Sequence, residues 1–219
     1  MQTFTNKEGA VIIDQLIIAI QENKQYLSDI DGLIGDGDHG INMNKGFTIC
    51  REELDKNPGD MAYGLKVLAK ILMMKIGGSM GPLYGKFFKA MGIALEGKEV
   101  IGIEEMGEAL KDAVDAIASI SPAKVGDKTL IDTLIPAVMA YVNAHAEGKS
   151  FSEAFEAMKC AAIEGRDSTK DMVAKLGRAS RLGERSRGVL DAGATSCCLI
   201  LEVLGNQAQI LLENKFVKI

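Results

Sequence analysis

Three aspartates near the start of the chain could hold a metal ion. Asp31, Asp36 and Asp38 lie close together on and beside the glycine-rich stretch 32–40. Carboxylates this close repel one another unless a cation collects them, and an all-oxygen set favours a hard ion such as Mg²⁺. An EF-hand is excluded because no Glu stands at its twelfth position. The alternative is a series of Asp-Gly turns with solvated carboxylates.

Glycine is concentrated in four clusters, and this is a second chemical signal. The chain has 24 glycines in 219 residues, which exceeds the typical share of about 7%. The clusters are residues 32–40, 77–82, 125–129 and 177–193. Each lies at the end of an expected helix, where backbone N–H groups and the helix dipole can bind phosphate. The competing interpretation is that these glycines only terminate helices.

The basic residues are concentrated in one segment, residues 175–187. Guanidinium groups match phosphate oxygens with paired hydrogen bonds, so an arginine here could neutralise charge during phosphoryl transfer. A solvated basic loop fits the same pattern. His39 follows the acidic turn and is better placed to contact phosphate than to bind metal. No Ser-His-Asp or Cys-His set can be assembled, so a hydrolytic nucleophile is not expected.

The elements that must position these residues are helices almost throughout. Apolar residues recur at the i, i+3, i+4 spacing of a one-faced helix, as in Ile13, Leu16 and Ile17. Strand-like alternation is nearly absent. Start and stop signals divide the chain into eight expected helices, at residues 6–29, 40–55, 60–76, 82–96, 103–120, 127–147, 151–175 and 192–213.

Capping residues and short connections indicate how these helices are arranged. Ser150 with Glu153 forms a capping-box pattern, and Asp60 and Asp127 can cap the helices that follow them. Short connections favour antiparallel neighbours, so we expect an all-α, up-and-down bundle or closed ring of helices, in one domain, residues 1–219. Alternate turns of such an array share one end. The four glycine clusters should therefore converge on one face.

The composition limits the classes of function. Apolar residues are 47% and charged residues 25% of the chain, and 25 Lys+Arg against 30 Asp+Glu give a net charge of −5. A globular protein without nucleic-acid partners is expected. The apolar runs are too short for a membrane span and Met1–Ala10 lacks a signal-peptide pattern, so we expect a cytoplasmic protein with no membrane partner. Reduced, buried thiols are expected at Cys50, Cys160, Cys197 and Cys198.

In this order, the motifs resemble those of the ADP-binding L subunits of phosphotransferase-system-dependent dihydroxyacetone kinases. The matching segments extend over most of the chain and are residues 35–40 with 42–44, 77–85, 126–129, 177–180, 182–186 and 191–196. The resemblance implies a closed barrel of antiparallel helices that binds ADP or ATP with Mg²⁺ at one end. It also implies a phosphotransferase of the phosphoenolpyruvate-glycerone type, active in glycerol metabolism. Bound nucleotide would relay a phosphoryl group from a phosphohistidine on an M subunit to dihydroxyacetone on a K subunit, and homodimerisation is left open.

The resemblance implies a role for each motif. Asp31, Asp36 and Asp38 would hold magnesium, Arg178 would be the catalytic phosphate clamp, and Leu130 would form an apolar wall for adenine. The nucleotide contacts it implies are His39, Gly40, Ile41, Asn42, Gly78, Ser79, Met80, Gly126, Thr129, Leu130, Arg178, Asp191, Ala192 and Gly193.

Two positions depart from the family pattern. Met80 stands where a residue with a hydroxyl group is usual, and Ala192 stands where proline is usual. Both changes fit a paralogue with a different ketose, a different partner or weaker nucleotide retention. Two alternatives therefore stay open: a subunit that senses ADP and magnesium without turnover, and metal-dependent hydrolysis of a phosphate ester, for which the chain lacks an evident base or nucleophile.

Overall fold

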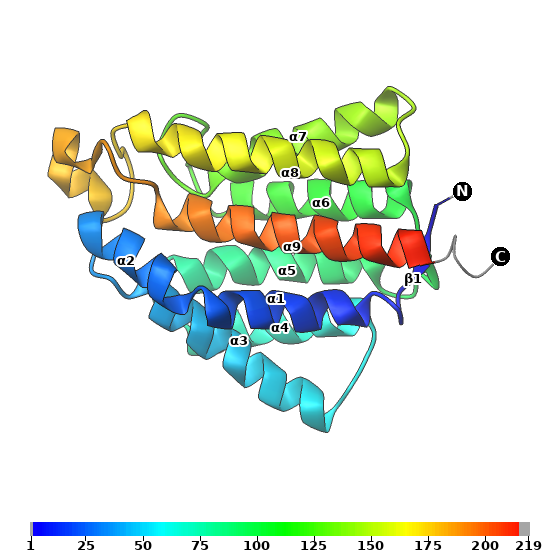
Figure 1. Ribbon diagram of the computed structural model, residues 1–219. Coiled ribbons are helices and arrows are strands. Elements are labelled where there is room, and N and C mark those ends of the chain that lie inside the picture. The colour runs from blue at the N-terminus through cyan, green and yellow to red at the C-terminus, as the bar shows by residue number, and fades with distance from the viewer. Residues whose placement is uncertain (1, 215–219) are drawn as a thin grey trace.

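The chain is helical over most of its length, which confirms the all-α class. The computed structural model describes residues 2–214, and Figure 1 shows long helices that lie side by side. The elements in chain order are β1 (Phe4–Thr5), α1 (Ala10–Glu22), α2 (Lys24–Ile34), α3 (His39–Lys56), α4 (Met61–Lys75), α5 (Met80–Leu95), β2 (Val100–Ile101), α6 (Ile103–Ala118), α7 (Ile131–Ala146), α8 (Phe151–Ser168), the 3₁₀ helices η1 (Thr169–Asp171) and η2 (Ala179–Ser186), and α9 (Ala192–Asn214).

Helices that follow one another in the chain pack together. From α3 to α9 each helix contacts the next, and α9 also contacts α1, which in turn contacts α3 and α4. Short connections between antiparallel neighbours produce such contacts between α4 and α5 and between α7 and α8, whereas longer segments precede α7 and α9. The core between the helices is aliphatic and aromatic, and includes a cluster in which the ring of Phe155 lies 5.4 Å from that of Tyr141 and 4.8 Å from that of Phe151. The short strands β1 and β2 pair antiparallel beside this core.

The first expected helix, residues 6–29, is in fact two helices. α1 ends at Glu22 and α2 begins at Lys24. Asn23 separates them, and its side-chain Nδ2 donates a hydrogen bond to the carbonyl of Ala19 at 2.9 Å. The apolar period continues through this break, which is why the pattern predicted one helix. Because α2 continues to Ile34, Asp31 lies on its last turn and not in the following loop.

The start of α7 also differs from the expectation. The helix begins at Ile131, and Asp127 does not cap it. Asp132 binds the preceding turn instead, because its carboxylate accepts hydrogen bonds from the N–H groups of Gly126 at 2.5 Å and Thr129 at 2.7 Å. The turn 126–129 is thereby fixed to the first turn of α7.

Two other predicted caps are confirmed. The Asp60 carboxylate accepts a hydrogen bond from the N–H of Tyr63 at 2.8 Å. Ser150 and Glu153 form the expected capping box at the start of α8. These caps depend on residues three positions apart, so the local sequence was sufficient to predict them.

The cysteines are all free, but they are not all buried. Cys50, Cys197 and Cys198 are buried, whereas Cys160 is exposed. The expectation of a buried thiol was therefore wrong for Cys160, which lies on the solvent-facing side of α8. Its Sγ lies 3.8 Å from the Glu156 carboxylate one turn earlier.

α9 is the one helix within residues 2–214 that is long and apolar enough to cross a membrane, at 23 residues. It is 56% buried over its most apolar window and contacts α1, α7 and α8. A helix enclosed by others has apolar residues over much of its surface. The hydropathy of α9 is explained by its place in the core.

Candidate functional site

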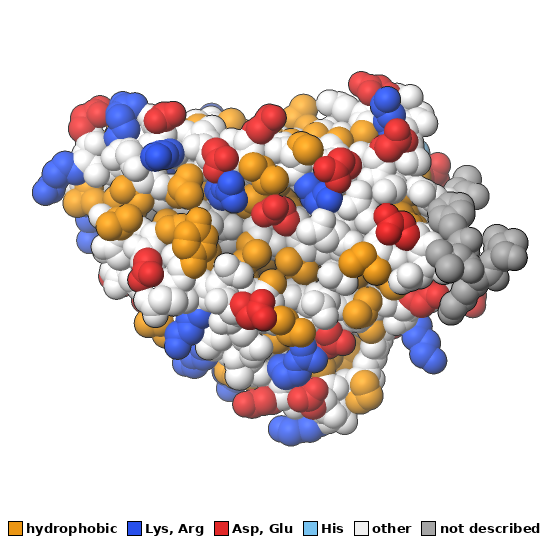
Figure 2. Space-filling model, in the orientation of Figure 1, with side chains coloured by type: hydrophobic (Ala, Val, Ile, Leu, Met, Phe, Trp, Pro, Cys, Tyr) orange, Lys and Arg blue, Asp and Glu red, His pale blue; other side chains and the backbone are white. Residues whose placement is uncertain are grey.

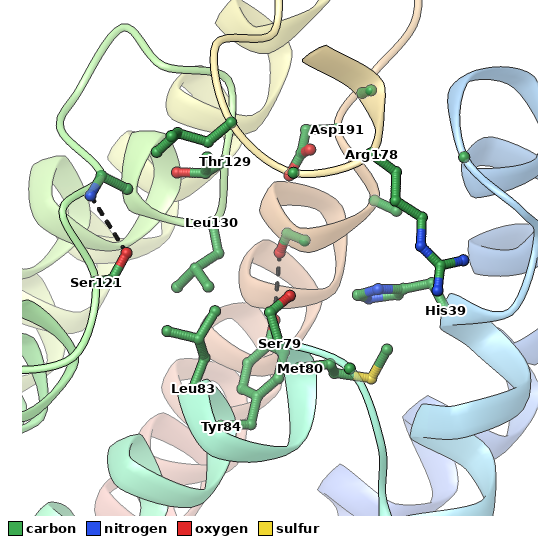
Figure 3. Close-up of a pocket in the computed structure, with 18 of the residues that line it drawn as sticks. His39, Ser79, Met80, Leu83, Tyr84, Ser121, Thr129, Leu130, Arg178 and Asp191 are labelled. Atoms are coloured by element: carbon green, nitrogen blue, oxygen red, sulfur yellow. Dashed lines mark hydrogen bonds between the residues drawn. The ribbon is translucent and has the colours of Figure 1, made fainter. Parts of the chain in front are cut away.

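A cavity of about 770 Å³ lies where the glycine-rich turns meet. Its volume falls within the ~300–1,000 Å³ typical of small-molecule sites. All four glycine clusters contribute lining residues, among them Gly35, Gly78, Thr129, Gly177 and Gly193. The convergence predicted from the alternation of turns is confirmed, and Figure 3 shows segments far apart in the chain around this cavity.

Asp31, Asp36 and Asp38 form an acidic cluster in the wall of the cavity. One carboxylate oxygen from each lies within 4.8 Å of the other two. Gly35 makes this arrangement sterically feasible, because a β-carbon there would lie only 2.3 Å from Asp31 Oδ1. Three convergent carboxylates beside open space for phosphate oxygens fit Mg²⁺, which binds through few carboxylates and keeps other positions for water or phosphate.

Arg178 reaches the acidic cluster from the loop that precedes η2. Its Nη1 forms an ion pair with Asp36 Oδ2, and the two side chains are 56% and 45% exposed. Exposed pairs of this kind contribute about 0–1 kcal/mol. The guanidinium can therefore exchange the carboxylate for a phosphate at little cost. Figure 3 shows it on the same side of the cavity as His39.

A buried chain of hydrogen bonds supports this wall. His39 Nε2 lies 2.8 Å from Ser196 Oγ, which lies 2.6 Å from the hydroxyl of Tyr84. The Tyr84 hydroxyl in turn donates to the carbonyl of Gly193 at 3.2 Å. These bonds connect α3, α5 and α9. Burial lowers the pKa of His39 to about 4, so the ring is neutral at pH 7 and offers hydrogen bonds but no positive charge.

The start of α5 faces the cavity with unused backbone donors. Ser79 is the N-cap residue and its side chain makes no capping hydrogen bond. Gly78 precedes it with φ of +72°, a conformation that favours glycine. Ser79 and Met80 line the cavity, and N–H groups at a helix N-terminus suit an anion. The turn at residues 77–80 can therefore bind phosphate through its backbone.

Another part of the cavity wall is apolar. Leu83 of α5 and Leu130 before α7 line it, with Ile120, Pro122 and Ala123 from the connection after α6. The side chains of Leu83 and Leu130 lie close together in Figure 3. An apolar wall opposite a polar one suits a ligand with a flat ring and a charged group.

Asp191 closes the site at the start of α9. Its half-buried carboxylate accepts a hydrogen bond from the N–H of Ala194 at 2.7 Å, and its own N–H donates to Thr169 Oγ1 at 3.0 Å. Burial raises the pKa of Asp191 to about 6, although Lys128 opposes the shift. The carboxylate caps the helix, which leaves Ala192 and Gly193 to line the cavity.

Three of the expected nucleotide contacts do not line the cavity. Gly40 is packed against α2, where a β-carbon would lie 1.9 Å from the carbonyl of Lys24. Ile41 is 52% exposed and lies outside the cavity lining. The N–H of Gly126 is bound by Asp132. The expected positions that do line the cavity are Asp31, Asp36, Asp38, His39, Asn42, Gly78, Ser79, Met80, Thr129, Leu130, Arg178, Asp191, Ala192 and Gly193.

Sequence reasoning missed Tyr84, Lys128 and the connection 120–123 as parts of the wall. Pro122 in that connection signals an irregular segment, which could have indicated a loop at the site. Tyr84 and Lys128 stand inside segments that matched family motifs, yet nothing in the local pattern distinguishes them from core or surface residues.

The comparisons with known proteins agree with this geometry. The family model described as the DAK2 domain matches residues 33–206. The "PEP-dependent dihydroxyacetone kinase 2, ADP-binding subunit DhaL" of Listeria innocua is 36% identical over 197 residues, which cover 88% of this chain and 90% of that protein. The "PEP-dependent dihydroxyacetone kinase, ADP-binding subunit DhaL" of Escherichia coli is 37% identical over 189 residues, which cover 84% and 89%.

A solved structure shares the fold. The dihydroxyacetone kinase of C. freundii, whose complex with AMP-PNP and Mg²⁺ is also solved, matches in its native form with a TM-score of 0.65 at 24% identity. The match covers 90% of this chain but 34% of that one. This likeness concerns the fold alone. On the extent of the family match and the identity to the DhaL subunits, the chain belongs to the DAK2 domain family and is similar over most of its length to ADP-binding DhaL subunits.

Proposed function

We propose that the chain is the ADP-binding subunit of a phosphotransferase-system-dependent dihydroxyacetone kinase. The observation that carries the proposal is the meeting of an acidic cluster, an arginine and a helix N-terminus in one cavity whose remaining wall is apolar. In this function a tightly held nucleotide relays a phosphoryl group from a phosphohistidine on an M subunit to dihydroxyacetone on a K subunit. The reaction is of the phosphoenolpyruvate-glycerone phosphotransferase type.

Each part of the site has a task in the proposed function. Asp31, Asp36 and Asp38 would hold Mg²⁺, which would supply positive charge to offset that of the phosphates. Arg178 exchanges Asp36 for a phosphate oxygen and stabilises the charge that develops during transfer. The N–H groups at Ser79 orient the phosphates. No side chain has to form a covalent bond, which agrees with the lack of an activated nucleophile among the described residues that line the cavity.

The proposal also includes a position for the adenine base of the nucleotide. Leu83 and Leu130 hold the adenine ring against the apolar wall, so that its phosphates extend toward the acidic cluster. His39 acts through its hydrogen bond to Ser196 and keeps the start of α3 in place beside Asp38. Ala192 and Gly193 form the edge that completes the enclosure.

We extend the proposal to the closure of the helices into a barrel and to the location and partners of the protein in the cell. The eight antiparallel helices α1 and α3–α9 close into a barrel, and the contact between α9 and α1 supports this closure. The barrel forms one domain, residues 1–219, in a cytoplasmic protein. Its partners are the K and M subunits.

The proposal is tested first by what the purified protein retains. Mass spectrometry of the dialysed protein should detect ADP, and labelled phosphate should pass from a phosphorylated M subunit to that nucleotide. Asp36→Ala should abolish both retention and transfer. Asp29→Ala is the matched control, since Asp29 is an exposed α2 carboxylate that pairs with Gln25 outside the cavity.

The outcomes separate the candidate functions. Bound ADP without transfer would favour a nucleotide-sensing subunit. A protein that binds no adenine nucleotide in magnesium would contradict both. Full activity of Asp36→Ala would show that the acidic cluster does not hold the metal.

A further inference from the structure

Lys128 is a lysine with almost no contact with solvent. Its exposed fraction is 1%. Its ammonium donates hydrogen bonds to four backbone carbonyls, those of Thr169 at 2.8 Å, Met172 at 3.2 Å, Ser186 at 2.7 Å and Val189 at 2.5 Å. A buried charge is tolerated only when such partners replace water. The carbonyls form a cage that the ammonium fills.

The four carbonyls belong to two separate stretches of chain. Thr169 and Met172 precede residues 173–188, the segment that we call the Arg178 loop, whereas Ser186 lies near the end of this segment and Val189 directly follows it. Other bonds also join its ends, from Gly188 N to Lys170 O at 2.7 Å, from Ala174 N to Ser186 Oγ at 2.9 Å and from the Arg187 guanidinium to the carbonyl of Asp171. Figure 1 shows the η2 part of this loop projecting beyond the neighbouring helix ends, and Figure 2 shows Lys and Arg side chains on the surface at that end of the molecule. Lys128 is thus bound to both ends of a loop that otherwise extends outward.

The backbone at Lys128 indicates that the side chain matters there. Its φ is +61°, and it is the one residue other than glycine with positive φ within residues 2–214. This conformation is unfavourable for a residue with a β-carbon, and glycine would adopt it without strain. The contacts of the ammonium compensate for this strain. They also connect the loop to Thr129 and Leu130, which follow directly and line the cavity.

We propose that Lys128 is a positioning residue that holds the ends of the Arg178 loop together and so keeps Arg178 at the acidic cluster. All of its donors are directed to the carbonyls, so it acts through Arg178 and not on a phosphate. The effect of Lys128 on phosphoryl transfer rests on the proposed function. Its effect on the position of the loop does not, because that effect depends only on the hydrogen bonds of the ammonium.

The loop part is tested with an arginine-specific protease on Lys128→Met, which keeps the chain length and removes the charge. The loop carries exposed arginines at 178, 181, 185 and 187, and a lysine substitution leaves these sites unchanged. Cleavage in the loop should accelerate about tenfold or more, because several charge-assisted hydrogen bonds are lost. The control is Lys170→Met, an exposed lysine at the same loop base, which should be cleaved like the wild type. Equal cleavage of Lys128→Met and the wild type would overturn the proposal.

A global loss of structure is recognised by cleavage at Arg51, which lies on α3 away from the loop. If the variant has lost its structure, hydrogen exchange in the wild-type protein tests whether the ends of the Arg178 loop are held in place. The amides of Ala174 and Gly188, at the loop ends, should exchange at least about tenfold more slowly than that of Arg181 in the middle. Similar exchange at the three positions would overturn the proposal.

The positioning role is tested by combining variants in the phosphoryl-transfer assay. Lys128→Met alone should lower the transfer rate about tenfold or more. In the Arg178→Ala background it should lower the rate no further, because the residue through which it acts is already absent. A further tenfold loss in that background would show that Lys128 acts by another route. A wild-type protein without transfer activity would contradict the proposed function and leave the protease result to decide the loop contacts.

Discussion

The Arg178 guanidinium forms an ion pair with Asp36, one of the three carboxylates of the acidic cluster. The pair joins the loop before η2 to the turn before α3, which are distant in sequence. It brings the groups proposed to bind phosphate and metal into direct contact. In the proposed function, phosphate would replace Asp36 as the partner of Arg178, and magnesium would replace Arg178 as the partner of Asp36.

Replacement of Arg178 should separate transfer from binding. Arg178→Ala should lower the rate of phosphoryl transfer by roughly 10³-fold, because the arginine stabilises charge that develops during the transfer. Nucleotide retention should fall much less, since the metal and the helix N-terminus remain. Single-turnover transfer of labelled phosphate measures the first and mass spectrometry the second. Arg185→Ala, an exposed arginine of the same loop, should leave both unchanged, and an unimpaired Arg178→Ala protein would contradict the assignment.

Gly35→Ala should weaken the binding of magnesium with ADP by about tenfold or more. The new methyl group would meet Asp31 Oδ1 at 2.3 Å, so the carboxylate has to leave its place in the acidic cluster. Calorimetric titration with ADP in magnesium measures the change. The control is Gly32→Ala, whose β-carbon would find its nearest neighbour at 3.9 Å. Equal affinities of the two variants would show that Asp31 is not needed at its observed position.

Met80→Ser should tighten ADP binding about fivefold, because a hydroxyl at the start of α5 adds one hydrogen bond to phosphate, worth about 1 kcal/mol. Met80 lines the cavity, so the new group would face the ligand. Met80→Ala removes the same side chain without adding a hydroxyl and is the control for the lost packing. Affinities are compared by calorimetry. If the serine and alanine variants bind ADP equally, the hydroxyl contributes nothing.

His39 should make the stability of the protein depend on pH. Its pKa is lowered from 6.5 to about 4 in the folded protein, so the unfolded chain binds a proton first as the pH falls. The free energy of unfolding should therefore decrease between about pH 6.5 and pH 4, by about 3 kcal/mol from this residue. Urea denaturation across this range measures it. His39→Gln should flatten this part of the profile and His145→Gln should not; equal profiles for the two variants would exclude His39 as the cause.

The sequence predicted the features that depend on local spacing. Apolar periodicity located the regions of the α-helices but not the 3₁₀ helix η2, and the caps at Asp60 and Ser150 follow from residues three positions apart. The alternation of turns predicted that the glycine clusters converge. The break at Asn23 could not be predicted in this way, because the apolar period runs through it without a glycine or proline.

The remaining differences arise from tertiary contacts that no local pattern encodes. Gly40 is required by the close approach of α2, and the N–H of Gly126 is bound by Asp132. Both glycines match family motifs, and the match alone does not distinguish a ligand contact from close packing. Lys128 is the strongest case, because a lysine in a glycine-rich turn is ordinarily exposed.

The unequal accessibility of the four thiols has a practical consequence for following this protein in solution. Cys160 lies at the surface of α8, whereas Cys50, Cys197 and Cys198 are enclosed, and burial raises the pKa of Cys50 and of Cys198 to about 12. A maleimide fluorophore added at neutral pH would therefore attach to one site on the native chain. A dye at that position would report changes on this flank of α8 without any engineered cysteine.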